Sequence, residues 1–322
     1  MVFIMAVAYF FYLLSPVSES ADLKIFSIPP GTGVSEIAEQ LYAQGVIRSA
    51  GAFKFYGFLS GSAHRLKPGS YSLAKNMSIK KIVEMLVLGP PDIEVLITEG
   101  KSLKDIDLHL AQMGLIKVGE LANFSFKGLT VEFPFLRDVS TMEGFLFPDT
   151  YKISPGSPPE IIIKRFLNNF REKASLAFGD AISKNGSNGW YENLIIASLI
   201  EKEVPAGDER KLVAGILEKR LALGMPLQVD ATVVYVKCSG RYDNCPPLTK
   251  SDFKIKSNYN TYYQKGLPPA PIANPGLDAL VAAVDPKKSD FLYYLSDPGT
   301  QKTIFSKTLE EHNLNRSRYL HL

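Results

Sequence analysis

The sequence has 322 residues, enough for about two domains that each have a hydrophobic core. Hydrophobic residues make up 46% of the chain and charged residues 21%, so the composition excludes a disordered protein. Lys and Arg number 36 against 33 Asp and Glu, and the basic residues are dispersed, which argues against a nucleic-acid partner.

The first segment of the chain is apolar. Residues 1–17 contain no charged side chain, and no other segment resembles them. A run of about 17 residues is at the short limit for a membrane-spanning helix. A cleaved secretory signal is the alternative, but it requires basic residues ahead of the apolar run, and the sequence has none there. We therefore expect an uncleaved transmembrane anchor at 1–17, with the remainder of the chain exported.

A glycine-bounded pattern occurs twice, at residues 31–47 and 100–116. Each copy follows strand-forming residues, has apolar residues four positions apart and ends at a glycine, which predicts a strand followed by an amphipathic helix. Residues 76–89 predict a further helix of this kind. We expect residues 18–91 to form a small βααβ subdomain that resembles the peptidoglycan-binding LysM module, with a purely structural scaffold as the alternative.

Residues 192–203 predict a helix of about three turns, since aliphatic residues recur at helical spacing and Pro205 interrupts the pattern. On a helical wheel Glu203 falls within the aliphatic face, whereas Glu201 falls on the other side and is expected to reach water. Burial disfavours a charged carboxylate and raises its pKa, so Glu203 is a candidate general acid. A simple ion pair of Glu203 with Arg210 or Arg220 is the structural alternative.

The following segments differ in character. Residues 208–224 predict a second amphipathic helix, and residues 225–236 predict a strand. Residues 257–276 are rich in Tyr, Asn and turn-forming residues without helical or strand period. Such loops suit carbohydrate, because aromatic rings stack on sugars while amides bind hydroxyl groups. Ordinary turn chemistry is the alternative explanation.

The two cysteines, Cys238 and Cys245, lie in one polar segment that predicts the tip of a hairpin. Their spacing and the expected export make them a candidate disulfide, with two unpaired thiols as the alternative. Neither the cysteines nor the four histidines show the spacing of zinc ligands. We therefore expect no metal site, and nothing in the sequence points to a cofactor.

Several sequence motifs occur together in a characteristic order. They are EGFLFPDTY at 143–151, ASLIEKE at 197–203, RLALGMPLQVDATVVY at 220–235, YNTY at 259–262 and GLPPAPIANPG at 266–276. In order and spacing they resemble the MltG (YceG-like) family of endolytic murein transglycosylases. The resemblance extends from the N-terminal segment to the pair His312 and Asn313. The chain departs from the usual pattern at four positions, none of which is the catalytic one: Val204, Lys219, Ala231 and Ala270.

This resemblance implies an α+β protein with an N-terminal transmembrane helix, the LysM-like subdomain and a larger mixed α+β catalytic domain at 92–322. It implies a single-pass protein of the bacterial inner (cytoplasmic) membrane, with the catalytic domain on the periplasmic, extracytoplasmic side. The implied activity is cleavage of the MurNAc–GlcNAc β-1,4 bond within nascent glycan strands, which leaves 1,6-anhydro-MurNAc ends and limits strand length. The catalytic glutamate of the family matches Glu203.

Glu203 is then expected to protonate the leaving oxygen and afterwards to accept the proton of the muramyl 6-hydroxyl group, which closes onto C1. A hydrolase would instead need a second carboxylate. The candidates for binding the sugar are Gln228, Asp230, Tyr259, Asn260, Thr261 and Tyr262. The expected partners are peptidoglycan strands and the membrane, with peptidoglycan synthases considered as further partners. The alternative function is a non-catalytic peptidoglycan-binding scaffold of the cell-wall elongation machinery.

Overall fold

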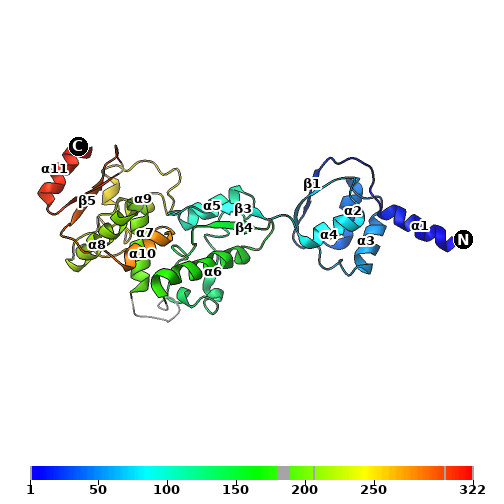
Figure 1. Ribbon diagram of the computed structural model, residues 1–322, viewed down its shortest axis with the longest axis horizontal. Helices are drawn as coiled ribbons and strands as arrows, with labels where there is room; N and C mark the ends of the chain where they lie inside the picture. The colour runs from blue at the N-terminus through cyan, green and yellow to red at the C-terminus, as the bar shows by residue number, and fades with distance from the viewer. Residues whose placement is uncertain (1, 180–188, 206, 301, 321–322) are drawn as a thin grey trace. The chain divides into compact units, whose positions relative to one another are not determined.

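The structure, a computed structural model, describes residues 2–179, 189–205, 207–300 and 302–320. The chain divides into two compact units (Figure 1). The first unit comprises Met1–Val95 and Lys152–Pro158, and the second comprises Leu96–Tyr151 and Pro159–Leu322. Each unit has its own buried hydrophobic residues, as the length of the chain predicts.

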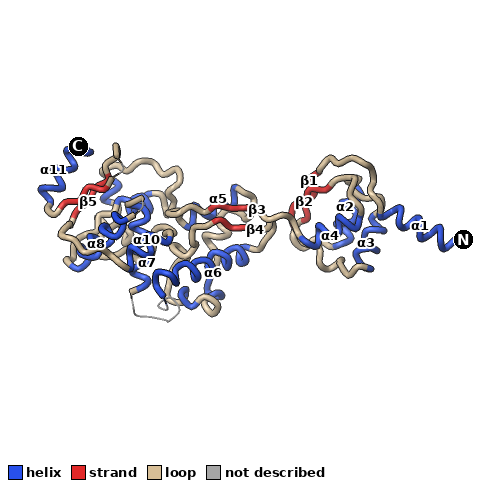
Figure 2. The backbone as a smooth tube through the Cα atoms, viewed as in Figure 1, coloured by secondary structure: helices blue, strands red, loops and turns tan. Residues whose placement is uncertain are grey.

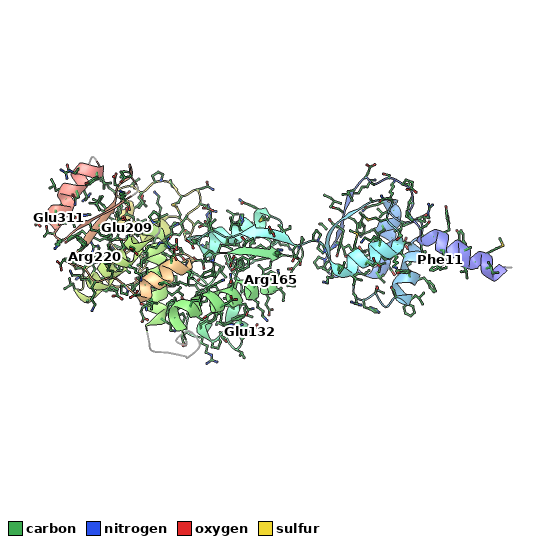
Figure 3. All side chains as sticks on the ribbon, viewed as in Figure 1. Phe11, Glu132, Arg165, Glu209, Arg220 and Glu311 are labelled. Atoms are coloured by element: carbon green, nitrogen blue, oxygen red, sulfur yellow. A yellow bond between two sulfur atoms is a disulfide. The ribbon has the colours of Figure 1, made fainter. Side chains whose placement is uncertain are left out.

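The first unit begins with α1 (Val2–Leu14), which carries no charged residue. Arg48 holds the end of this helix, because its Nη1 donates to the Tyr12 hydroxyl (2.9 Å) and its Nη2 to the Pro16 carbonyl (2.7 Å). Most of its described side chains are exposed, and Phe11 is 66% accessible. Figure 3 labels Phe11 on this helix. Within the described residues, no helix is both long enough and apolar enough to cross a membrane.

The remainder of the first unit packs helices against a two-stranded sheet. Its elements in chain order are β1 (Lys24–Ile28), α2 (Val34–Ala43), α3 (Ala50–Leu59), β2 (Gly69–Leu73) and α4 (Ile79–Leu88). The strands are antiparallel, with Phe26 opposite Tyr71, and both of these side chains are buried in the core. The order strand, helix, helix, strand is the expected one, whereas the likeness to LysM stays a prediction.

The second unit is mainly helical. The division between the units falls within the strands β3 (Ile93–Leu96) and β4 (Thr150–Ile153). The other regular elements of the second unit are α5 (Leu103–Gln112), α6 (Pro159–Phe178), α7 (Trp190–Glu203), α8 (Asp208–Ala222), α9 (Asp230–Lys237), α10 (Leu277–Val284), β5 (Tyr293–Ser296), β6 (Thr303–Ser306) and α11 (Leu309–Leu320). Short 3₁₀ helices lie at Phe126–Leu129, Pro134–Leu136 and Asp252–Lys254. The strands pair as β3 with β4 and β5 with β6 (Figure 2). The predicted mixed α+β class is confirmed.

The repeated sequence pattern folds into the same local structure in both copies. Helices α2 and α5 have ten residues each, and a left-handed glycine follows each of them: Gly45 with φ 66° and Gly114 with φ 71°. Glycine is favoured there because a Cβ atom would strain this backbone conformation. Ile37 and Ile106, at the same offset in the two copies, are both buried. The local pattern therefore determined these helices and their ends.

Helix α7 lies at the centre of the second unit. It packs against α8, α9 and α10, and its residues Leu194 to Ile200 are all buried. A helix with neighbours on every side needs an apolar surface all round, which explains its run of aliphatic residues. An aromatic cluster, in which Phe145 contacts Phe135, Phe170 and Trp190, packs near the start of the helix.

The prediction of a strand at residues 225–236 is wrong, because this segment contains helix α9. Its β-branched residues favour a strand, but tertiary contacts override that preference. Gln228 is left-handed (φ 54°), which turns the chain. The Val229 amide then donates to Oγ1 of Thr261 (2.9 Å), and the Val229 carbonyl accepts from Oγ1 of Thr232 (2.6 Å). These contacts bind the backbone just before the helix begins at Asp230.

Cys238 and Cys245 form a disulfide, with their Cα atoms 5.9 Å apart. The segment is a closed loop rather than the predicted hairpin tip, because a helix precedes it and, among the described residues, no strand follows it before β5. The backbone amides of Tyr242 and Asp243 donate to the carboxylate of Asp105 (3.1 and 3.3 Å). The loop is thereby held against α5.

Candidate active site

The last turn of α7 places two glutamates in different surroundings. Oε1 of Glu201 accepts a hydrogen bond from Nη2 of Arg210 (2.8 Å), and Oε2 accepts from the Gly276 amide (3.0 Å). The Glu201 side chain is only 5% exposed. The expectation that Glu201 reaches water is therefore wrong. Helix α7 has neighbours on every side, so α8 and the start of α10 cover the face of the helix that carries Glu201.

Arg210 is fully occupied by this arrangement. Besides pairing with Glu201, it donates to the carbonyls of Val204 (3.0 Å) and Pro205 (2.7 Å), which fixes the turn after α7. Arg210 therefore does not form the alternative ion pair with Glu203. Glu203 has no salt bridge with any residue in the described part of the chain.

Residues of three elements surround the carboxyl group of Glu203. Oε2 accepts a hydrogen bond of 3.1 Å from the hydroxyl of Tyr294 on β5. The backbone amide of Ala231, in the first turn of α9, also bonds to this carboxyl group. Arg220 of α8 adds a favourable positive charge, but its Nε and Nη1 donate to the carbonyls of Leu292 (2.8 Å) and Leu227 (2.7 Å).

These surroundings raise the pKa of Glu203 from 4.5 to about 7. Burial is the main cause, and the negative charge of Asp230 adds to it. The hydrogen bonds from Tyr294 and the Ala231 amide, together with the charge of Arg220, act in the opposite direction. A carboxyl group with this pKa populates both protonation states near neutral pH, which suits a group that must donate a proton and then accept one.

Glu203 lines a pocket of about 830 Å³. The wall combines aromatic rings with charged and amide side chains, and Arg220 of this wall is labelled in Figure 3. Apolar rings beside a few polar groups are typical of a small-molecule or sugar site. Of the six residues predicted to bind sugar, Gln228, Asp230 and Tyr262 line this pocket with Glu203, and the Tyr262 hydroxyl donates to Oδ1 of Asp230.

The other three predicted residues lie elsewhere. Asn260 is buried, and its Nδ2 donates to the carbonyls of Phe253 (3.1 Å) and Ile255 (2.8 Å). Thr261 is 2% exposed and binds the Val229 amide, as described above. Tyr259 is partly buried beside Tyr235, at 5.2 Å between ring centroids, and is not among the residues that line this pocket. These residues shape the loop and the start of α9 instead of facing the pocket.

A second buried carboxyl group, Glu143, was not singled out from the sequence. Burial raises its pKa to about 8. Its Oε1 accepts from the Leu103 amide (2.8 Å) and from Nδ2 of Asn274 (3.1 Å), while the Tyr235 hydroxyl donates to Oε2 (3.3 Å). Glu143 does not line the pocket of Glu203. A raised pKa by itself therefore does not identify the catalytic group, and the pocket is the deciding observation.

The sequence also did not indicate Tyr294, the residue that donates to Glu203. It lies 91 positions away on a short strand, and no local pattern connects the two residues. Among the residues that the structure describes, no three His, Cys, Asp or Glu side chains are arranged to hold a metal ion.

Known proteins are similar to this chain over most of its length. A family model described as the YceG-like family matches residues 26–318. An endolytic murein transglycosylase of Bacillus subtilis (strain 168) is 33% identical over 96% of this chain and 88% of its own length. One from Streptococcus pneumoniae (strain ATCC BAA-255 / R6) is 30% identical over 91% of this chain, which spans 58% of that longer protein.

A solved structure has a similar fold. The 2.6 Å crystal structure of a yceG-like protein from Listeria monocytogenes superimposes with a TM-score of 0.61 and 31% sequence identity. The match covers 92% of this chain and 100% of the other.

Proposed function

The chain belongs to the YceG-like family, and we propose that Glu203 is the acid/base with which it cuts the glycan strand of peptidoglycan. The activity is that of a lytic transglycosylase, a lyase, in agreement with the names of its relatives from two bacterial species. One observation supports the choice of residue. Among the described carboxyl groups, Glu203 and Glu143 have a pKa raised to a value of about 7 or above. Of these two residues, only Glu203 lines the pocket.

The reaction needs one carboxyl group in two successive roles. Protonated Glu203 donates its proton to the oxygen between MurNAc and GlcNAc, and the bond from that oxygen to C1 of MurNAc breaks. The carboxylate that remains then accepts the proton of the 6-hydroxyl group of the same MurNAc, whose oxygen bonds to C1. The products are a free GlcNAc hydroxyl and a 1,6-anhydro end, and Glu203 is again protonated. No water is consumed, and the tethered hydroxyl needs no second carboxylate to bring it to C1.

Hydrolysis is the second candidate reaction, and one residue of the pocket wall supports it. Asp230 supplies a second carboxylate in the same wall as Glu203, and a hydrolase uses a second carboxylate to activate water or to act as the nucleophile. The two reactions differ in product mass, since a 1,6-anhydro product is one water lighter than a reducing end.

The test is digestion of un-crosslinked glycan strands by the purified full-length chain, with products read by mass spectrometry. We compare the wild type with Glu203→Gln and with Glu192→Gln, an exposed glutamate in the first turn of the same helix. Loss of a general acid costs about 10²- to 10⁴-fold in rate. Anhydro-ended fragments from the wild type and Glu192→Gln, but not from Glu203→Gln, would support the proposal. A Glu203→Gln chain with normal activity would exclude it, and product from none of the three would favour a non-catalytic scaffold.

We further propose that the apolar N-terminal segment anchors the chain in the bacterial cytoplasmic membrane, with the pocket on the outer side. The uncharged run at 1–17 and the exposed apolar side chains of α1 support this, as does a disulfide, which persists in oxidising compartments. Membrane fractionation followed by protease digestion of intact spheroplasts tests both points. A chain that stays in the soluble fraction, or that is protected from external protease, would contradict the proposal.

The order of elements in the first unit and the sequence resemblance support a LysM-like role in holding glycan strands. Sedimentation of the Glu203→Gln chain with insoluble peptidoglycan, with and without residues 18–91, tests it. Equal sedimentation of both chains would count against a binding role for this unit.

A further inference from the structure

The pocket around Glu203 carries more positive charge than a neutral sugar backbone requires. Four basic side chains line it, against the two acidic residues Glu203 and Asp230. When Glu203 is protonated, only one ionised acidic group faces the four basic ones. Desolvated or clustered cations are unfavourable without an anion nearby, so the arrangement points to a negatively charged ligand.

The four basic residues are not equivalent. Lys202 is occupied, since its Nζ donates to the Gly100 carbonyl (3.2 Å) and lies 3.9 Å from the ring centre of Tyr242. Arg220 is fixed by two backbone carbonyls, as described above. The side chains of Lys250 and Arg316, in contrast, are exposed and have no hydrogen bond or ion pair with any residue that the structure describes. They are the two cations available to a ligand.

Helix α11 presents one face to the pocket. Leu309, His312, Arg316 and Leu320 all line it, and their spacing of three to four residues places them along one side of the helix. His312 and Arg316 are one turn apart on that face, so a single group in the pocket can reach both of them. Arg318, two positions further along, falls on the other side of the helix and does not line the pocket.

His312 in the pocket wall has an unsatisfied ring nitrogen. Its Nδ1 is buried and has no hydrogen-bond partner in the described part of the chain. Its ring stacks on Tyr293 of β5, with 5.3 Å between ring centroids, which fixes its position beside the pocket. A buried polar atom without a partner is unfavourable, so an oxygen from a ligand that bonds to it would stabilise the complex.

We propose that Lys250, Arg316 and His312 form a subsite that binds a carboxylate carried by the glycan strand, so that the enzyme selects anionic strands over neutral ones. This inference rests on the proposed function, because it names a recognition element of the same pocket. Arg and Lys bind carboxylates through charge-assisted hydrogen bonds, and they also raise the rate of encounter with an anionic strand.

Two sources on a murein strand have this chemistry. One is the stem peptide, which carries free carboxylates on its side chains and at its end. The other is the lactyl group of MurNAc, whose carboxylate is free only where the peptide has been removed. The proposal concerns the shared carboxylate, and the substrates below distinguish the two sources.

The experiment uses the full-length chain and four preparations of un-crosslinked strands. These are strands with stem peptides, the same strands after chemical amidation of their carboxylates, strands from which an amidase has removed the peptides, and those strands after amidation. Binding is measured with the Glu203→Gln chain, which leaves the strand intact, and KM and kcat are measured with the wild type. The variants are Arg316→Gln and Lys250→Gln, with Arg318→Gln and Lys256→Gln as matched controls from exposed positions outside the pocket.

We expect each of Arg316→Gln and Lys250→Gln to weaken binding and raise KM by about fivefold on the carboxylate-bearing strands, as for a partly exposed ion pair, with little change in kcat. Amidation of the strands should have at least a similar effect on the wild type and a smaller effect on each variant, because each variant keeps one of the two cations. The preparation on which the effect is larger identifies the source of the carboxylate. Both controls should behave as the wild type.

Unchanged affinity in both variants, or equal binding of native and amidated strands by the wild type, would overturn the subsite. Failure of the proposed function has a different signature, since the wild type would then cut none of the four preparations while the binding measurements would still report on the subsite.

Discussion

The hydroxyl of Tyr294 lies 3.1 Å from Oε2 of Glu203 and donates a hydrogen bond to it. This bond connects β5 to the end of α7 within the second unit. A hydrogen bond to the carboxylate favours the charged form, so Tyr294 lowers the pKa that burial and Asp230 raise. The value of about 7 is therefore a balance, and single substitutions should move it in opposite directions.

Substitution Tyr294→Phe should raise the pKa of Glu203 above about 7, because it removes a donor to the carboxylate. A general acid stays protonated to a higher pH when its pKa rises, so the alkaline limb of the profile of kcat/KM against pH should move upward by on the order of one unit. The measurement is the pH profile of anhydro-product formation. Tyr263→Phe, at an exposed tyrosine, serves as control and should leave the limb in place. A downward shift for Tyr294→Phe would contradict the assignment.

Substitution Asp230→Asn should lower the pKa of Glu203, because it removes the negative charge that opposes ionisation. The alkaline limb should then move downward, again by on the order of one pH unit. Product masses from the same reactions also test the role of Asp230 in hydrolysis. If wild-type products include reducing ends and these disappear in Asp230→Asn, Asp230 activates water. An unchanged limb would show that its charge does not act on Glu203.

Glu143→Gln should change how stability depends on pH. The folded pKa of Glu143 is about 8, above the ordinary 4.5, so ionisation is harder in the folded chain than in the unfolded chain. The contribution of Glu143 to the stability of the wild type is therefore fully present below about pH 4.5 and falls as pH rises toward 8. Above pH 8, Glu143→Gln should be more stable than the wild type by on the order of 3 kcal/mol, while near pH 5 that advantage should be absent.

Urea unfolding at pH 5 and pH 9 tests this, followed by fluorescence of Trp190, the only tryptophan of the chain. Trp190 packs in the aromatic cluster of the second unit, so it reports on the unit that contains Glu143. Glu192→Gln, at an exposed carboxyl group, is the control. Equal stability of Glu143→Gln and the wild type at both pH values would contradict the proposed burial of a neutral carboxyl group.

Removal of the disulfide should destabilise the second unit moderately. A short closed loop such as 238–245 restricts the unfolded chain by about 2 to 3 kcal/mol. The double variant Cys238→Ser/Cys245→Ser should therefore unfold at lower urea, again by Trp190 fluorescence. Activity should fall less than tenfold, because the bonds of Tyr242 and Asp243 to Asp105 still hold the loop. Reduced wild type should match the double variant, and an unchanged midpoint for both would show that the disulfide contributes little.

Much of the local structure could be predicted from the sequence. The paired patterns that contain Ile37 and Ile106 predicted two helices with glycine ends, and both are present. The close spacing of Cys238 and Cys245 indicated a disulfide that the structure contains. Such features depend on residues that are neighbours along one element, so their periodicity and spacing record them directly.

The surroundings of each side chain could not be predicted in the same way. The wheel placed Glu201 toward water, but Arg210 and Gly276 cover it. The β-branched residues after Asp230 favoured a strand, but contacts from Thr261 in a distant loop led the chain into a helix. In both cases segments far apart in sequence decided the outcome.

The sequence by itself determined that a glutamate ends an aliphatic helix and that its motifs match one enzyme family. Only the tertiary structure decided that Glu203, and not Glu143, lines the pocket of about 830 Å³, that Tyr294 bonds to Glu203, and that Arg316 of α11 lines the same wall. A periodic pattern specifies which face of an element is apolar, whereas the partner on that face depends on how several elements pack together. For this reason the catalytic candidate was found from the sequence, but the groups that set its pKa were found only in the fold.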